Sequence, residues 1–205
     1  MPDNEFLSDL KRAREEEYFH KKEQALEEEH RQRALREAKR GELGAVIGIF
    51  EEHLLNELLV RGFTPETIRL LYLIPALEVA WVDGSVSGSE HARMLEFGRE
   101  LGAEEGSPGY EQLLAWLKDK PTTDFFEAML RLIGGVCGLQ PPTVGEATLR
   151  KVTSYCSQIA EASGSWLALG SKVSRPEAEI IDRIVSQLRK RFQRQMDTLD
   201  WNPSC

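Results

Sequence analysis

The chain has 205 residues, a length that allows one domain, or one domain with an extension. Its 26 Lys and Arg residues and 34 Asp and Glu residues give a formal net charge of −8. That balance argues against a nucleic-acid binder, because neutralising phosphates requires a clustered cationic face. Apolar residues make up 41% of the chain, enough for a core. Composition therefore indicates a soluble, acidic, mostly globular protein and points to no particular chemistry.

The cysteines and the N-terminal segment bear on the cellular compartment. Three cysteines in a chain of this length do not form a disulfide framework, and no Cys-x-x-Cys occurs. Residues 1–5 are acidic and no apolar segment follows, so no signal peptide is expected. The longest nearly uncharged stretch, residues 68–82, is too short to cross a bilayer. We therefore expect a cytoplasmic protein that does not span a membrane.

The first 42 residues differ in composition from the rest. Residues 4–40 lack Gly and Pro and are dominated by Glu, Arg, Lys, Gln and Ala. Acid-before-base pairs four residues apart, such as Glu17 and Lys21, each stabilise a helix by about 0.2–0.5 kcal/mol. We predict a charged N-terminal helical extension over residues 1–42 and an all-α domain over residues 43–205.

The apolar residues of this extension do not hold a sustained heptad, which argues against a strict coiled coil. Two interpretations remain. The extension is either a solvated helix or a docking helix that binds a partner through Tyr18, Phe19 and Leu26.

From residue 44 to about residue 195 the apolar periodicity is helical, and strand-like alternation is nearly absent. A helix carrying Val46 and Leu58 is predicted to end at Gly62. Thr64 is predicted to cap the next helix, which Pro65 begins and Pro75 kinks.

Further helices are predicted after the loop at residues 83–87, stopping near Gly102, then a short one opened by Ser107-Pro108 that carries Leu117, and one that begins at Asp124 and is broken by residues 141–143. A capping-box pattern at Thr143 and Glu146 begins a helix that runs to about Ser163. The last predicted helix begins at Ser174 and runs toward residue 196. The result is a compact helical domain of about seven helices with no sheet.

Two segments of this domain are alike. Residues 79–90 read Val-Ala-Trp-Val-Asp-Gly-Ser-Val-Ser-Gly-Ser-Glu; the second segment reads Ile-Ala-Glu-Ala-Ser-Gly at 159–164 and resumes as Val-Ser-Arg-Pro-Glu at 173–177. Each predicts a helix, a turn with Gly, and a second helix opened by Val-Ser-x-x-Glu. In the second copy Ser163 stands in the place of Asp83 and the loop is longer. Pairing of two helix–loop–helix units about a pseudo-twofold axis would form an all-α core.

The first segment resembles the hallmark of the TerB-like (tellurite-resistance TerB) family. Ala80-Trp81-Val82-Asp83-Gly84, followed by Val86 and Glu90, matches the pattern Ala-x-x-Asp-Gly-x-Val-x-x-x-Glu, and the resemblance covers about residues 64–188. It implies an all-helical domain with internal pseudo-symmetry. It also implies an association with tellurite and other chemical stress, with metal ions and with membrane-linked complexes, and no established catalytic activity. Ser163 departs from the pattern, which weighs against a carboxylate pair shared between the two halves.

The loop of the first segment also has the pattern of a cation site. Asp83, Ser85 and Ser87 place oxygen side chains at alternate positions, as at the start of an EF-hand loop, although Met94 stands where that loop has its final acid. Glu90 adds a second carboxylate. Because Ca²⁺ takes about 6–8 oxygens, water or another segment would have to complete the set. We predict a site for a divalent cation, with Ca²⁺ or Mg²⁺ favoured over Zn²⁺.

A purely structural interpretation of the same residues also stands. Ser87-x-x-Glu90 and Ser174-x-x-Glu177 both fit the capping box, and Asp83-Gly84 is a common turn dipeptide. No cap requires Asp83, so the two interpretations are compatible there. The sequence contains no P-loop, His-Glu-x-x-His or Gly-x-Ser-x-Gly pattern, and we expect no enzyme.

Three further features concern partners. The segment Arg14-Glu15-Glu16-Glu17-Tyr18-Phe19, with Leu26 after it, is similar to the helix of mitochondrial-type ATP synthase inhibitor proteins. Trp166 and Leu167, in the second loop, either fold onto the core or form an exposed docking patch. The basic run at 189–194 either sits favourably near a helix C-terminus or contacts anionic lipid or an acidic partner.

The favoured function is a non-enzymatic TerB-like binding and stress-response module that responds to divalent metal and docks protein partners, membrane-associated ones included. The alternative is a regulatory subunit or inhibitor that acts through its N-terminal helix on an ATPase or another large assembly.

Overall fold

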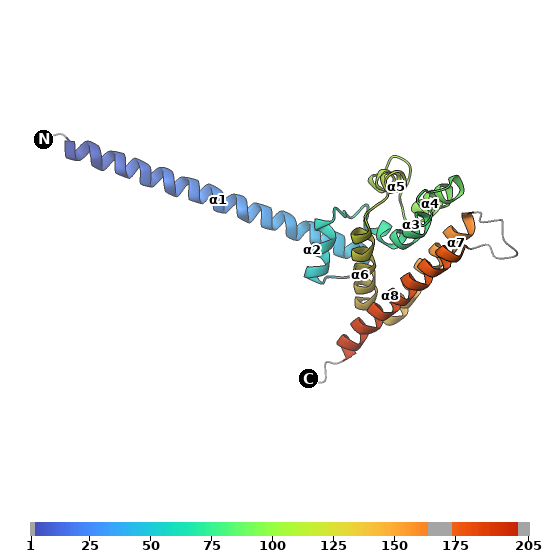
Figure 1. Cartoon of the computed structure of the whole chain (residues 1–205). Helices are drawn as coiled ribbons and strands as arrows, with labels where there is room; N and C mark the ends of the chain where they lie inside the picture. Colours follow the sequence, from blue (N-terminus) through green and yellow to red (C-terminus); the bar gives the residue numbers. More distant parts are fainter. Residues whose placement is uncertain (1–2, 164–173, 201–205) are drawn as a thin grey trace. The chain divides into compact units, whose positions relative to one another are not determined.

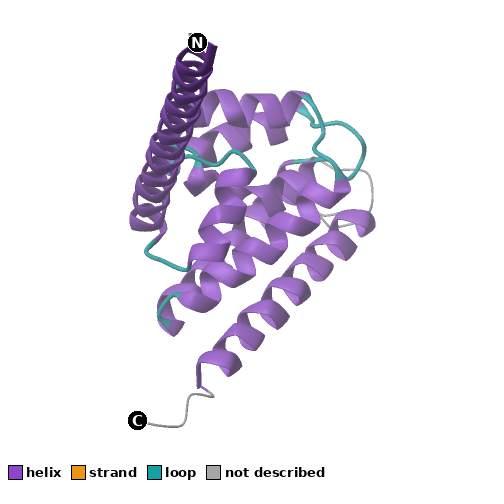
Figure 2. Cartoon of the chain, turned by 90° about the vertical axis from the view of Figure 1, so that its left-hand side faces the viewer, coloured by secondary structure: helices purple, strands orange, loops and turns teal. Residues whose placement is uncertain are grey.

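The structure is a computed structural model that describes residues 3–163 and 174–200. In these ranges it contains α-helices and one 3₁₀ helix and no strand (Figures 1 and 2), so the predicted all-α fold is confirmed. The elements are α1 (Asp3–Ile47), α2 (Glu52–Val60), η1 (Ile68–Leu73), α3 (Ile74–Ala80), α4 (Gly88–Glu100), α5 (Pro108–Lys118), α6 (Thr123–Leu139), α7 (Pro142–Ala162) and α8 (Arg175–Asp200). No helix in the described part of the chain is long and apolar enough to cross a membrane.

The chain divides into two compact units, residues 1–41 and residues 42–205. The first consists of most of α1, whose residues 20–39 are exposed and predominantly charged or polar. Ion pairs within the helix, such as Arg33 Nε to Glu37 Oε1 at 3.2 Å, add to its strong helix propensity. The last turn of α1 belongs to the second unit, where Leu43 and Ile47 are buried in the core.

The helix predicted to carry both Val46 and Leu58 does not exist as one element. Instead, α1 ends at Ile47, and Gly48 adopts a φ of +71°, a left-handed conformation that commonly ends helices. The chain then turns, and α2 begins at Glu52, where the Glu51 carboxylate accepts hydrogen bonds from the backbone amides of His53 and Leu54. The sequence prediction missed Gly48 as the stop signal.

The predicted helix starts at Thr64 and Thr143 and the predicted kink at Pro75 are also wrong. Thr64 does not cap an α-helix, because the Thr67 hydroxyl accepts its backbone N–H at 2.9 Å and the chain continues through a turn into the 3₁₀ helix η1. Pro75 lies in the first turn of α3 and so begins a helix instead of kinking one. Likewise, α7 begins at Pro142 without a side-chain cap, and Glu146 pairs with Arg150 at 3.4 Å instead of closing a capping box at Thr143.

The core is built on α6, which packs against α7 and α8, while α3 packs against α7. Apolar residues recur along α6 at the spacing of one helix face, and Met129, Ile133 and Val136 are fully buried. Aromatic residues extend this core toward α5, where the indole N–H of Trp81 donates to the backbone carbonyl of Trp116 at 3.0 Å.

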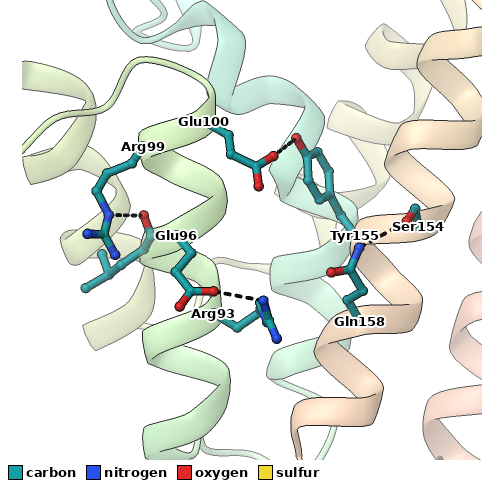
Figure 3. A network of polar contacts seen from close by, with 8 residues as sticks. Arg93, Glu96, Arg99, Glu100, Ser154, Tyr155 and Gln158 are labelled. Carbon is teal, nitrogen blue, oxygen red and sulfur yellow. Dashed lines mark hydrogen bonds and ion pairs between the residues drawn. The ribbon is translucent and has the colours of Figure 1, made fainter.

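One aromatic pair and two hydrogen bonds, from Ser89 to Ala162 and from Tyr155 to Glu100, join α4 and α7, and Figure 3 shows the second of these bonds. The rings of Phe97 and Tyr155 lie with their centroids 4.4 Å apart, and the Tyr155 hydroxyl donates to Glu100 at 3.3 Å. The other hydrogen bonds drawn in Figure 3 stay within α4 or within α7. The tilted rings and the hydrogen bonds together hold the two helices side by side.

Candidate functional site

The two repeated segments of the sequence lie together in the fold. The first is α3 and α4 with the turn between them; the second consists of α7 and α8. Both α3 and α4 pack against α7, which also contacts α8. The turn after α3 and the start of α8 are therefore held close to the end of α7.

The first turn is closed by a complete capping box at the start of α4. The backbone N–H of Ser87 donates to Glu90 Oε2 at 2.8 Å, and the backbone N–H of Glu90 donates to the Ser87 hydroxyl at 3.3 Å. Gly84 has a φ of +84°, which explains the glycine after Asp83. The side chain of Glu90 points inward, and the residue is only 4% exposed.

The start of α8 repeats this arrangement. The backbone N–H of Ser174 donates to Glu177 Oε2 at 2.7 Å, and the backbone N–H of Glu177 donates to the Ser174 hydroxyl at 3.4 Å. Glu177 is 1% exposed. Ser163, which stands in the place of Asp83, uses its hydroxyl to donate to the carbonyl of Ala160. Both Val-Ser-x-x-Glu motifs thus form the hydrogen bonds of a capping box.

Carboxylates of the two repeated segments are close enough to repel one another. Burial raises the pKa of Glu90 above its usual value, the negative charges of Glu177 and Asp83 raise it further, and hydrogen bonds from Ser87 oppose the rise. A direct contact also joins the two repeated segments, because the Ser89 hydroxyl donates to the carbonyl of Ala162 at 2.6 Å. We call Asp83, Glu90 and Glu177 the acidic junction.

The predicted cation ligands do not all lie in one environment. Asp83 and Ser85 are exposed, Ser87 is half-buried, and Glu90 is buried. The Ser87 hydroxyl and one oxygen of Glu90 are already engaged in the capping box. Within residues 3–163 and 174–200 no group of three or more His, Cys, Asp or Glu side chains is arranged to hold a metal ion. The cation site therefore stays a prediction, and the observed role of Glu90 is structural.

The sequence assigned Glu177 only a cap, and it missed a second link between the repeats. Arg183, in the second turn after Glu177, donates from Nη2 to Glu78 Oε1 of α3 at 2.5 Å. Glu78 Oε2 is buried without a hydrogen-bond partner. This pair fixes α8 against α3, and so helps to hold Glu177 at the acidic junction. Only the repeat itself indicated that these segments would meet.

Of the predicted docking residues, the structure places Tyr18 and Leu26 on the surface of α1, at 63% and 55% exposure. They are eight residues apart and so lie about 80° apart around the helix, on one side. Leu35, also exposed, lies about 180° from Leu26. The side chain of Phe19, and Trp166 and Leu167, lie outside the described residues.

Comparison of the chain with protein-family models, curated proteins and solved structures finds no match. The resemblance to the TerB-like family therefore rests on the sequence motif around Asp83.

Proposed function

We propose that the protein is a non-enzymatic, TerB-like binding module of a chemical-stress response, tellurite included, that takes up a divalent cation at the acidic junction and docks a protein partner through α1. The observation that supports the cation proposal is the negative charge of Glu177 and Asp83 near the buried carboxyl group of Glu90. Burial and the negative charges of Glu177 and Asp83 raise the pKa of Glu90, and a bound cation would offset this repulsion.

The chemistry of these groups favours Ca²⁺ or Mg²⁺. All of them are oxygen ligands, which hard cations prefer, and neither His nor Cys is among them. The caps use Oε2 of Glu90 and Oε2 of Glu177, which leaves Oε1 of each glutamate outside the cap. Asp83 and Ser85 face solvent, so water can complete the coordination.

Metal content and thermal unfolding test this proposal on the full chain. We expect Ca²⁺ or Mg²⁺ to raise the melting temperature of the wild type and to have no effect on Asp83→Asn. Asp119→Asn, an exposed residue at the end of α5 with the same change in charge, is the matched control and should behave as wild type. A purified protein without divalent metal, whose melting temperature Ca²⁺, Mg²⁺, Mn²⁺ and Zn²⁺ leave unchanged, would overturn the cation half.

A second candidate function is that of a regulator or inhibitor that acts through α1 on an ATPase or another large assembly, such as a membrane-linked one. The exposure of Tyr18 and Leu26 on one side of a 45-residue helix favours it. Deletion of residues 1–41 should abolish capture of the partner, and so should Leu26→Ser. Leu35→Ser changes an exposed leucine on the opposite side and should leave capture intact. Capture that survives the deletion would exclude this function.

A further inference from the structure

A pocket is lined by residues of α2, α6 and α8. Its volume is about 510 Å³, within the range of small-molecule sites. It is lined by Arg131 of α6 and by Arg191 and Arg194 of α8. Arg191 follows Glu177 by fourteen residues of one helix, which corresponds to about 21 Å along its axis. We call this site the arginine pocket.

The basic run of α8 is not explained by the helix dipole. The helix continues to Asp200, and its last turn contains no basic residue. Favourable charge near a helix C-terminus falls off within the last turn, so it does not account for Arg191. Instead the run divides around the helix. Arg191 and Arg194 line the arginine pocket, whereas Arg189 lines the groove between α7 and α8.

Two acidic side chains in the pocket are already engaged. Glu57 Oε1 accepts hydrogen bonds from Arg131 at 2.9 Å and from Arg61 at 3.1 Å, so one carboxylate is shared between two guanidinium groups. Although burial raises the pKa of Glu57, these arginines outweigh it and hold the pKa below its usual value. Glu51 caps α2 through its two carboxylate oxygens. In a chain of net charge −8, the pocket therefore concentrates positive charge.

The guanidinium groups lie close enough for their positive charges to repel one another. Burial lowers the pKa of Arg191, and the neighbouring Arg131 and Arg194 lower it further, whereas the negative charge of Glu127 opposes this fall. Gly134 permits this approach, because a Cβ at that position would lie 2.5 Å from the Cβ of Arg191. The glycine lets α8 lie against the backbone of α6 and brings the base of Arg191 to the edge of the pocket. An anion between the guanidinium groups would relieve their repulsion.

We propose that the arginine pocket binds the phosphate group of a small phosphomonoester. Guanidinium groups pair with phosphate through two parallel N–H···O bonds, and several of them around one site match its charge and its three terminal oxygens. Apolar side chains of Leu54, Leu132 and Leu139 line the same pocket and would contact the organic part of the ligand. The site does not depend on the acidic junction or on the docking role of α1.

Isothermal titration of the full chain with inorganic phosphate and with phenyl phosphate tests the proposal. We expect both to bind at low salt, and phenyl phosphate to bind more tightly because of the leucines. Arg191→Gln keeps the aliphatic stem and should weaken both by at least about tenfold. Arg189→Gln removes the same charge from the same helix outside the pocket and should leave both affinities unchanged. An equal loss in the two variants, or no binding to the wild type, would overturn the proposal.

A second variant, Glu57→Gln, tests the site even if Arg191→Gln fails to fold. Glu57→Gln removes the carboxylate that competes for Arg131 and should tighten phosphate binding several-fold; unchanged or weaker binding would contradict the pocket as the site. Vesicles distinguish a soluble ester from a lipid headgroup. In this assay the protein is sedimented with phosphatidylcholine vesicles that contain phosphatidic acid. If the wild type sediments with them, Arg191→Gln does not, and phenyl phosphate does not bind, the ligand is a lipid headgroup and not a soluble ester.

Discussion

Replacement of Arg183 by methionine should destabilise the domain by about 2 kcal/mol. Its guanidinium donates to Glu78 across the contact between α8 and α3. The side chain of Glu78 is only 13% exposed, and its second carboxylate oxygen is buried without a hydrogen-bond partner. Methionine keeps much of the apolar stem but leaves the carboxylate in a poorly solvated place without its cation.

The expected magnitude follows from the exposure of the two partners. Removal of one partner from a fully buried ion pair costs about 3–5 kcal/mol, whereas an exposed pair contributes about 0–1 kcal/mol. The side chain of Arg183 is 37% exposed, so water partly replaces it, and the cost falls between the two limits. Glu78→Gln removes the charge and should cost about 1 kcal/mol. In the Glu78→Gln background, Arg183→Met should cost less than about 1 kcal/mol, because no buried charge is left behind.

Urea unfolding followed by tryptophan fluorescence measures these differences, since Trp81 and Trp116 lie in the domain and not in α1. A lower midpoint at unchanged slope indicates a change in stability. Arg150→Met removes an ion pair to Glu146 whose side chains are 70% and 59% exposed, and should change the free energy of unfolding by less than about 0.5 kcal/mol. Equal effects of Arg183→Met and Arg150→Met would refute the reasoning, as would a loss of the same size with and without Glu78.

Three further predictions concern the same domain. A Cβ on Gly145 would collide with the carbonyl of Cys137, so Gly145→Ala should lower the free energy of unfolding by about 1–3 kcal/mol; Gly88→Ala, which meets nothing within 4 Å, should be nearly neutral by the same urea assay. Because the pKa of Glu90 is raised, its contribution to stability is present at low pH and is lost as the pH rises through its folded value. In melting curves recorded with a chelator, the melting temperature of the wild type should fall between acidic and neutral pH, and Glu90→Gln should remove this fall. A wild-type melting temperature that rises with pH would show instead that the fold stabilises the charged carboxylate. Deletion of residues 1–41 should leave the urea midpoint unchanged, because the second unit has its own core, and a lower midpoint would contradict that independence.

Features that depend on residues close in sequence were predictable. The starts of α4 and α8 follow from Ser87 with Glu90 and from Ser174 with Glu177, since each set of hydrogen bonds spans only three residues. The all-α fold and the absence of strands from the described ranges follow from the helical periodicity of apolar residues.

Local patterns failed where tertiary packing selects among several possible local structures. Thr64 and Pro65 have the pattern of a helix start, but the segment that follows forms a 3₁₀ helix whose Ile68 and Leu71 are fully buried. Thr143 has the pattern of a capping box, but Pro142 already provides a helix start that needs no amide partner. In both places more than one start is locally acceptable, and the packing of buried side chains decides.

The parts of the candidate sites that are distant in sequence could not be predicted. Glu78 and Arg183 are 105 residues apart, and the arginine pocket joins residues of three helices. The basic run of α8 was visible in the sequence, yet the division of Arg191 and Arg189 between two surfaces depends on which helices pack beside α8. The repeat predicted that its two copies would meet. Ser163 in the place of Asp83 argued against a carboxylate pair shared between them, whereas the structure brings the charge of Glu177 near Glu90, the equivalent residue of the other copy.

Helix α8 contributes to both proposed sites, and variants at different positions can separate them by experiment. Its first turn holds Glu177 at the acidic junction, its middle is joined to α3 by Arg183, and Arg191 lines the pocket. If the seating of α8 determines both sites, Arg183→Met should weaken the binding of a cation and of phosphate together. Asp83→Asn should then affect only the cation, and Arg191→Gln only the phosphate. A loss of both ligands in either of these two variants would mean that they act through the stability of the domain and that neither residue contacts its ligand.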